Sequence, residues 1–127
     1  MIMNREEYIY YAFMKKVTKD GFISLDESGL ILILEDKLGL SDDKMDEIMG
    51  WIEDEEAPVS GKELDSVADD TSNHLYELNI YESILKEALM DVSIERDEKE
   101  LLMALTSIMN VTEEERSKIY DHIKSLI

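Results

Sequence analysis

The sequence predicts an all-α fold of about seven helices, arranged as two pseudo-symmetric three-helix units joined by a connector helix. Two observations predict this fold class. Apolar residues recur with helical spacing in several segments, and the chain repeats its own pattern after 71 positions. We expect residues 1–127 to form a single domain, with repeat units at 8–53 and 79–124 and a connector at 54–78.

The repeat aligns residues 8–53 with residues 79–124 without a gap, and 11 of the 46 aligned positions are identical. The identical pairs are Ile9/Ile80, Tyr10/Tyr81, Lys15/Lys86, Asp20/Asp91, Ile23/Ile94, Asp26/Asp97, Glu27/Glu98, Leu30/Leu101, Leu34/Leu105, Ile48/Ile119 and Ile52/Ile123. Because these identities fall in phase with the apolar pattern, we interpret the two segments as copies of one structural unit.

The first helix of each unit is predicted from apolar residues at positions i, i+3, i+4 and i+7, which form one stripe. The two stripes are Tyr10, Phe13, Met14 and Val17, and their copies Tyr81, Ile84, Leu85 and Ala88. The second helix is ambiguous in the first unit, because residues 30–34 are all Leu or Ile and could form a buried strand. Its copy at 101–105 is rich in strong helix formers, so the repeat favours a helix in both units.

The third helix of the first unit and its copy carry apolar residues at similar spacing. These residues are Met45, Ile48, Met49 and Ile52, and in the copy Ile119, Tyr120 and Ile123. Side chains that cap helices predict where several helices start. The predicted capping boxes are Ser24 with Glu27, Ser60 with Glu63 and Thr112 with Glu115, and Ser41 is expected to cap the third helix.

The connector between the units begins after Ala57 and Pro58, which mark the end of the first unit. A connector helix is expected to follow Ser60. Its apolar side is predicted to comprise Leu64, Val67, Ala68, Leu75 and Leu78.

Composition narrows the class of protein. The chain has no Cys, which excludes disulfides, thiol nucleophiles and zinc–thiolate sites, and it has only two His. The longest aliphatic run, residues 30–34, is far shorter than the ~20 apolar residues that span a bilayer. The first seven residues lack the basic and apolar regions of a signal peptide. We therefore expect a soluble, cytoplasmic protein.

The chain is strongly acidic, with 31 acidic and 13 basic residues and a net charge of −18. The excess is evenly divided, because residues 1–64 and residues 65–127 each carry a net charge of −9. Such a surface repels phosphate backbones, so direct nucleic-acid binding is not expected. A protein partner with a basic surface is the favoured partner, and the sequence does not indicate an oligomeric state.

Two short motifs link helix ends to helix starts. Residues 20–27 (DGFISLDE) contain an Asp-Gly turn followed by an Ile-Ser-x-x-Glu helix start, and residues 38–41 (LGLS) form a second junction. Together they resemble the tellurite-resistance TerB-like family. The second unit keeps Asp91 and Glu98 but has Val92 where Gly21 stands. The resemblance implies an all-α stress-response or accessory module without established enzymatic activity, for which metal binding is one option.

Four carboxylates are candidate metal ligands: Asp20, Glu27, Asp91 and Glu98. They stand at equivalent positions of the two units, and hard cations such as Ca²⁺ or Mg²⁺ prefer oxygen ligands. A divalent cation is therefore the one cofactor that the sequence suggests. Turns and helix caps alone also account for every one of these residues, and the sequence leaves both interpretations open. An EF-hand loop beginning at residue 16 is disfavoured, because the positively charged Lys16 stands at the first ligand position, where a carboxylate is needed.

A second group of acidic residues is a candidate surface for a basic partner, although charge runs are often only solvated helix ends. This group comprises Glu53, Asp54, Glu55, Glu56, Asp65, Asp69 and Asp70.

Several methionines fall on core-facing positions and are expected to fill the core. They are Met14, Met45, Met49, Met103 and Met109. Trp51, near a helix end, is expected to be a partly buried packing residue.

No catalytic motif is found in the sequence. His74 and His122 have no signature that links them to a nucleophile, and there is no glycine-rich phosphate loop. We therefore expect a non-enzymatic binding or scaffold module that acts through its acidic surface in a stress-response context. The alternatives are a metal-ion sensor or buffer, and a nucleic-acid mimic that blocks a basic protein.

Overall fold

The computed structural model describes residues 3–19, 25–55, 60–90 and 96–126. These residues form seven helices and no strand, which confirms the predicted all-α class. The helices are α1 (Arg5–Lys19), α2 (Leu25–Leu38), α3 (Asp42–Glu53), α4 (Gly61–Ala68), α5 (His74–Met90), α6 (Arg96–Ile108) and α7 (Glu113–Leu126). The ambiguous aliphatic run at 30–34 is helical, as its copy in the second half of the chain predicted.

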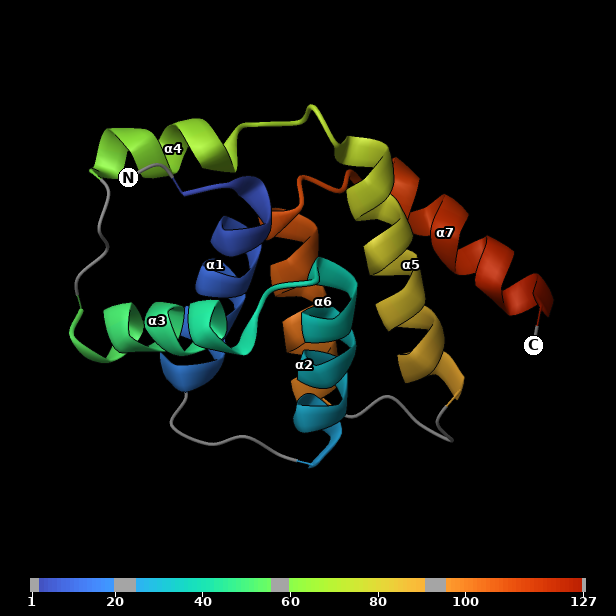
Figure 1. Cartoon of the computed structure of the whole chain (residues 1–127). Helices are drawn as coiled ribbons and strands as arrows, with labels where there is room; N and C mark the ends of the chain where they lie inside the picture. Colours follow the sequence, from blue (N-terminus) through green and yellow to red (C-terminus); the bar gives the residue numbers. More distant parts are fainter. Residues whose placement is uncertain (1–2, 20–24, 56–59, 91–95, 127) are drawn as a thin grey trace.

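Helices α1, α2, α5 and α6 form the centre of the molecule (Figure 1). α1 packs against α6, and α5 packs against α2. α3 and α4 both pack on α1, whereas α7 packs on α5, so α3 and α4 lie on the side of the molecule away from α7 (Figure 1). The second half of the chain therefore contacts the first half mainly through the four central helices.

The core is one cluster of buried apolar side chains, to which every helix except α4 contributes. Among the large side chains that are fully buried are Phe13, Val17, Leu34, Ile48, Ile84, Leu105, Met109 and Ile123. α4 contributes only the partly buried Leu64. Burial of apolar area, at about 25 cal/mol per Å², is the main stabilising contribution in such a core.

Capping side chains begin the helices at three of the predicted positions. Ser41 accepts a hydrogen bond from the Lys44 amide at 3.1 Å, and Ser60 accepts one from the Glu63 amide at 3.2 Å. The capping box of Thr112 with Glu115, described below, is complete in both directions. The predicted box of Ser24 with Glu27 lies outside the described residues.

In each half of the chain, one residue with a positive φ follows the second helix. Gly39 follows α2 with φ 68°, and Asn110 follows α6 with φ 57°. These residues are 71 positions apart, and each is followed two residues later by a helix cap, Ser41 or Thr112. Glycine tolerates this left-handed backbone without strain, and asparagine is one of the few other residues that adopts it often.

The predicted extent of the connector helix is wrong, because the helix that follows Ser60 is shorter than expected. α4 ends at Ala68, where the Asp69 amide donates to the Asp65 carbonyl at 3.0 Å, and α5 begins only at His74. The intervening residues 69–73 are Asp, Asp, Thr, Ser and Asn, all of which favour turns over helix. Leu75 consequently does not continue the apolar side of the connector, and it is 78% exposed.

The predicted burial of Met103 is also wrong, because this side chain is 61% exposed. α6 directs Leu101, Leu102 and Leu105 into the core, which leaves position 103 on the solvent side. The equivalent residue of the first half, Leu32, is likewise 65% exposed. Met14 and Met109 are buried as expected, and Met45 and Met49 are partly buried against the core.

Candidate functional site

The four candidate metal ligands cannot be placed, because Asp20 and Asp91 and the side chains of Glu27 and Glu98 lie outside the described residues. The backbone puts residues 27 and 98 in the first turns of α2 and α6. Within the described ranges, no group of three or more His, Asp or Glu side chains is placed to hold a metal ion.

The candidate partner-binding carboxylates fall into two groups at opposite ends of α1. The α3 carboxylates, Glu53, Asp54 and Glu55, are exposed where α3 ends. The α4 carboxylates, Asp65, Asp69 and Asp70, are exposed on and just after α4. Glu56 lies outside the described residues.

The separation of these groups follows from the helices that hold them. Glu53 and Glu55 line one hollow together with Lys15 and Lys19, which are in the second half of α1. The end of α4 instead contacts Arg5, at the start of α1. Because α1 has 15 residues and is about 22 Å long, the two groups form separate acidic surfaces.

Arg5, which no sequence pattern indicated as a functional residue, donates five side-chain hydrogen bonds. Its guanidinium donates to both carboxylate oxygens of Glu77 at 3.0 and 2.9 Å, and both residues are buried. It also donates to the carbonyls of Val67 and Ala68 at the end of α4, and to that of Ile108 at the end of α6. One side chain thus joins the ends of α4 and α6 to α1 and α5, and it satisfies helix carbonyls that have no partner in their own helix.

Asn110 adds a second link between the ends of α4 and α6. Its side-chain amide donates to the Ala68 carbonyl at 2.8 Å, while its backbone makes the left-handed turn after α6. The Ala68 carbonyl therefore accepts hydrogen bonds from both Arg5 and Asn110.

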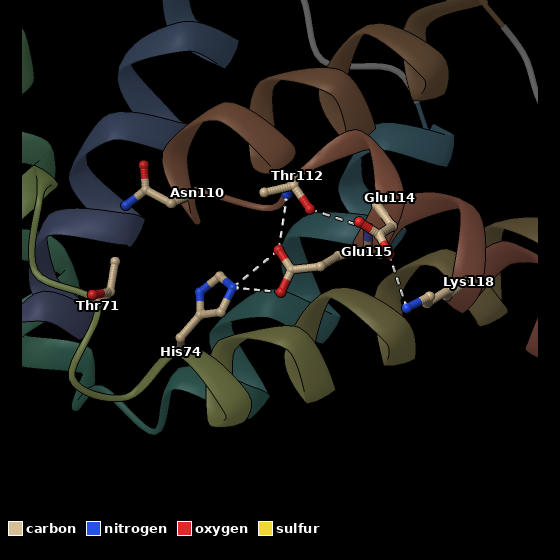
Figure 2. A pocket seen from close by; sticks show the side chains of 7 residues that line it. All are labelled: Thr71, His74, Asn110, Thr112, Glu114, Glu115 and Lys118. Carbon is tan, nitrogen blue, oxygen red and sulfur yellow. Dashed lines mark hydrogen bonds and ion pairs between the residues drawn. The ribbon is translucent and has the colours of Figure 1, made fainter.

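Next to Asn110 is a hollow of about 580 Å³ between the starts of α5 and α7 (Figure 2). The polar pair at its centre is His74, whose Nε2 lies 2.9 and 3.1 Å from the two carboxylate oxygens of Glu115. Glu115 is held from the other side by Thr112, whose backbone amide donates to Oε1 at 2.9 Å. The hydroxyl oxygen of Thr112 accepts from the Glu115 amide at 3.1 Å, which completes the predicted capping box.

The surroundings of Glu115 stabilise its ionised form. The hydrogen bond from the Thr112 backbone lowers the pKa of the Glu115 carboxyl, and the contact with His74 acts in the same direction. A carboxylate facing Nε2 favours a proton on that nitrogen, which leaves Nδ1 of a neutral His74 as an acceptor. Nδ1 is buried and has no hydrogen-bond partner among the described residues.

The polar groups around this hollow are mainly engaged with one another. Lys118 lies 3.1 Å from Glu114, and the Thr112 hydroxyl belongs to the cap of α7 (Figure 2). Since Nδ1 of His74 has less than 1 Å² of accessible area, a ligand entering the hollow would not reach it without movement of the protein. The contact between His74 and Glu115 is therefore best described as a link between α5 and α7.

Comparison with known proteins yields no relative: no family model matches the chain, and no curated protein or solved structure gives a significant match. None of the described helices is both long and apolar enough to cross a membrane. The case for a function therefore rests on the residues and their geometry.

Proposed function

We propose that this chain is a non-enzymatic binding or scaffold module that docks through its acidic surfaces onto a basic partner protein. The proposal places it in a stress-response setting like that of the TerB-like family. Docking would be largely electrostatic, with the negative surface accelerating encounter with a positive partner and orienting it.

The observation that carries this proposal is that the α3 and α4 carboxylates are exposed and form no ion pair with a described residue. All six are exposed, and among the described residues no cation lies within ion-pair distance of any of them. They belong to the segment 42–70, which has twelve acidic but only two basic residues. This concentration of net negative charge exceeds what the even division between the two halves of the chain indicated.

The TerB-like arrangement is part of the same proposal, and two observations support it. α1 packs against α6 as α5 packs against α2, which is the pairing expected for two copies that exchange equivalent contacts. Gly39 and Asn110 make the same left-handed turn at equivalent positions before equivalent helix caps.

The test is a comparison of three proteins of defined charge. In the patch variant, Glu53→Gln, Glu55→Gln, Asp65→Asn and Asp69→Asn remove four charges from the acidic surfaces. In the matched control, Asp36→Asn, Glu87→Gln, Glu114→Gln and Asp121→Asn remove four exposed charges elsewhere. Proteins captured from the source cell at physiological salt are identified by quantitative mass spectrometry, and each candidate is then purified and its Kd measured.

We expect at least one basic protein to bind the wild-type chain and the control, and to lose at least tenfold in affinity for the patch variant. Equal weakening by both variants would contradict docking at these surfaces, because net charge alone would then explain binding. Competition by duplex DNA would separate ordinary docking from nucleic-acid mimicry, since a mimic must occupy the partner's DNA site.

A further inference from the structure

A second and larger hollow lies between the second half of α1 and the end of α3, and its volume is about 720 Å³. Its apolar lining consists of Tyr11, Met49, Trp51 and Ile52. Tyr11 is 8% exposed and belongs to the core, while the other three are partly buried against it. This hollow, which we call the groove, therefore opens the edge of the hydrophobic core to solvent. Trp and Tyr in such positions are the residues that most often dominate binding at protein interfaces.

The two walls of this groove carry opposite charges. Lys15 and Lys19 stand on the α1 wall, and Glu53 and Glu55 stand on the α3 wall. All four are exposed. No described group forms an ion pair with any of them, although the Lys15 ammonium lies 5.6 Å from the centre of the Tyr11 ring.

The spacing of the two lysines indicates that a helix is the kind of partner segment that fits the groove. Lys15 and Lys19 are four residues apart on one helix, so their side chains stand one turn apart on the same face. A helix lying alongside would present acidic side chains with the same spacing, and its apolar face would fill the groove. Its other edge would meet Glu53 and Glu55, where basic side chains are complementary.

We propose that this groove binds an amphipathic helix of the partner protein, with a large apolar side chain placed on Trp51. The basic edge of that helix contacts Glu53 and Glu55, and its acidic edge contacts Lys15 and Lys19. This inference rests on the proposed function and specifies how one of the acidic surfaces recognises its partner. The oppositely charged walls give the partner a defined orientation, which a uniformly acidic surface would not.

The test uses the whole chain and its own fluorescence, because Trp51 is the only tryptophan. The probe is a synthetic helical peptide without Trp, acetylated and amidated at its ends. It carries one Phe and two Leu on one face, two Arg on one edge and two Glu, four residues apart, on the other. We expect saturable binding with a blue shift of Trp51 emission, since the peptide removes water from the indole. A peptide with Ala in place of Phe should bind roughly tenfold or more weakly.

Two single substitutions separate groove binding from general attraction. Lys19→Gln and Lys62→Gln each remove one exposed positive charge, but Lys62 is on α4 and does not line the groove. Groove binding predicts that Lys19→Gln weakens binding roughly threefold, the usual effect of an exposed ion pair, and that Lys62→Gln does not weaken it. If both variants leave binding unchanged or tighten it equally, the inference is wrong.

The outcomes also distinguish this inference from the proposed function. If the peptide leaves Trp51 emission unchanged while a basic partner still depends on the α3 and α4 carboxylates, the groove is not the binding site and the proposed function stands. If the peptide binds as expected but the patch variant retains every partner, the groove remains a helix-binding site and the acidic-surface function is wrong.

Discussion

At the scale of single residues, Arg5 of α1 is bonded to three other helices, α4, α5 and α6. It is 5% exposed, it pairs with the buried Glu77, and it donates to three carbonyls at the ends of α4 and α6. Removing one member of a buried ion pair leaves the other charge uncompensated, which is costlier than the net contribution of the intact pair.

We therefore predict that Arg5→Ala lowers the free energy of unfolding by about 3–5 kcal/mol. Urea denaturation followed by circular dichroism measures the change. Glu6→Ala, at the neighbouring and more exposed position, is the control and should cost well under half as much. A loss below about 1 kcal/mol for Arg5→Ala would mean that water replaces its contacts.

Two glycines provide a matched pair with effects of opposite sign. Gly29 lies inside α2 with open space around it, so Gly29→Ala should raise the free energy of unfolding by about 0.5–1 kcal/mol. Gly39 has φ 68°, so Gly39→Ala should lower it by about 1–2 kcal/mol despite equally open surroundings. Urea midpoints for the two variants that shift in the same direction would contradict this account.

At the scale of helices, the start of α7 combines a cap with a link to α5. The folded environment lowers the pKa of Glu115, chiefly through the hydrogen bond from the Thr112 backbone. A carboxyl whose pKa is lowered on folding stabilises the protein above its unfolded pKa, and this contribution is lost as the pH falls through the folded pKa.

We predict that Glu115→Gln reduces the loss of stability on acidification from about pH 6 to about pH 2, because Gln does not titrate. The free energy of unfolding of wild type and variant, measured across this range, should converge at low pH. Thr112→Ala, which removes the hydroxyl cap, should cost about 1 kcal/mol. Parallel pH profiles for wild type and Glu115→Gln would show that Glu115 has the same pKa in both states.

The presence of the helices was predictable from the sequence because apolar spacing and capping residues agree with the tertiary structure. Ser41, Ser60 and Thr112 begin helices as their side chains predict. The break at 69–73 was missed because apolar residues on both sides fit one periodic stripe, although the turn-forming residues between them were visible in the sequence. Met103 was misplaced because a run of five apolar residues necessarily turns some of them toward solvent.

The site was less predictable than the helices, because its contacts join residues remote in sequence. Arg5 and Glu77 are 72 positions apart, and His74 and Glu115 are 41 apart. No fixed spacing links either pair. The α3 carboxylates were recognised from the sequence, but the groove beside them requires the packing of α3 on α1. The predicted function and metal ligands stay predictions.

At the scale of the whole molecule, the net charge of −18 produces repulsion that folding concentrates into a smaller volume. Raising NaCl from about 10 to about 150 mM shortens the Debye length from about 30 to about 8 Å and screens this repulsion. We predict that Tm rises by a few degrees over this range, measured by differential scanning calorimetry. The four-charge patch variant should show a smaller rise, and a Tm that falls with salt would indicate that attractive ion pairs dominate.

The contact between Arg5 and the Ile108 carbonyl spans 103 positions, and it sets a condition on biosynthesis. At about 5–20 residues per second, the ribosome finishes residue 108 roughly 5–20 s after residue 5. Throughout that interval α1 lacks α6, against which it packs in the finished protein. A nascent chain ending near residue 60 therefore exposes the part of the α1 surface that α6 later covers, and it should bind general chaperones until translation is nearly complete.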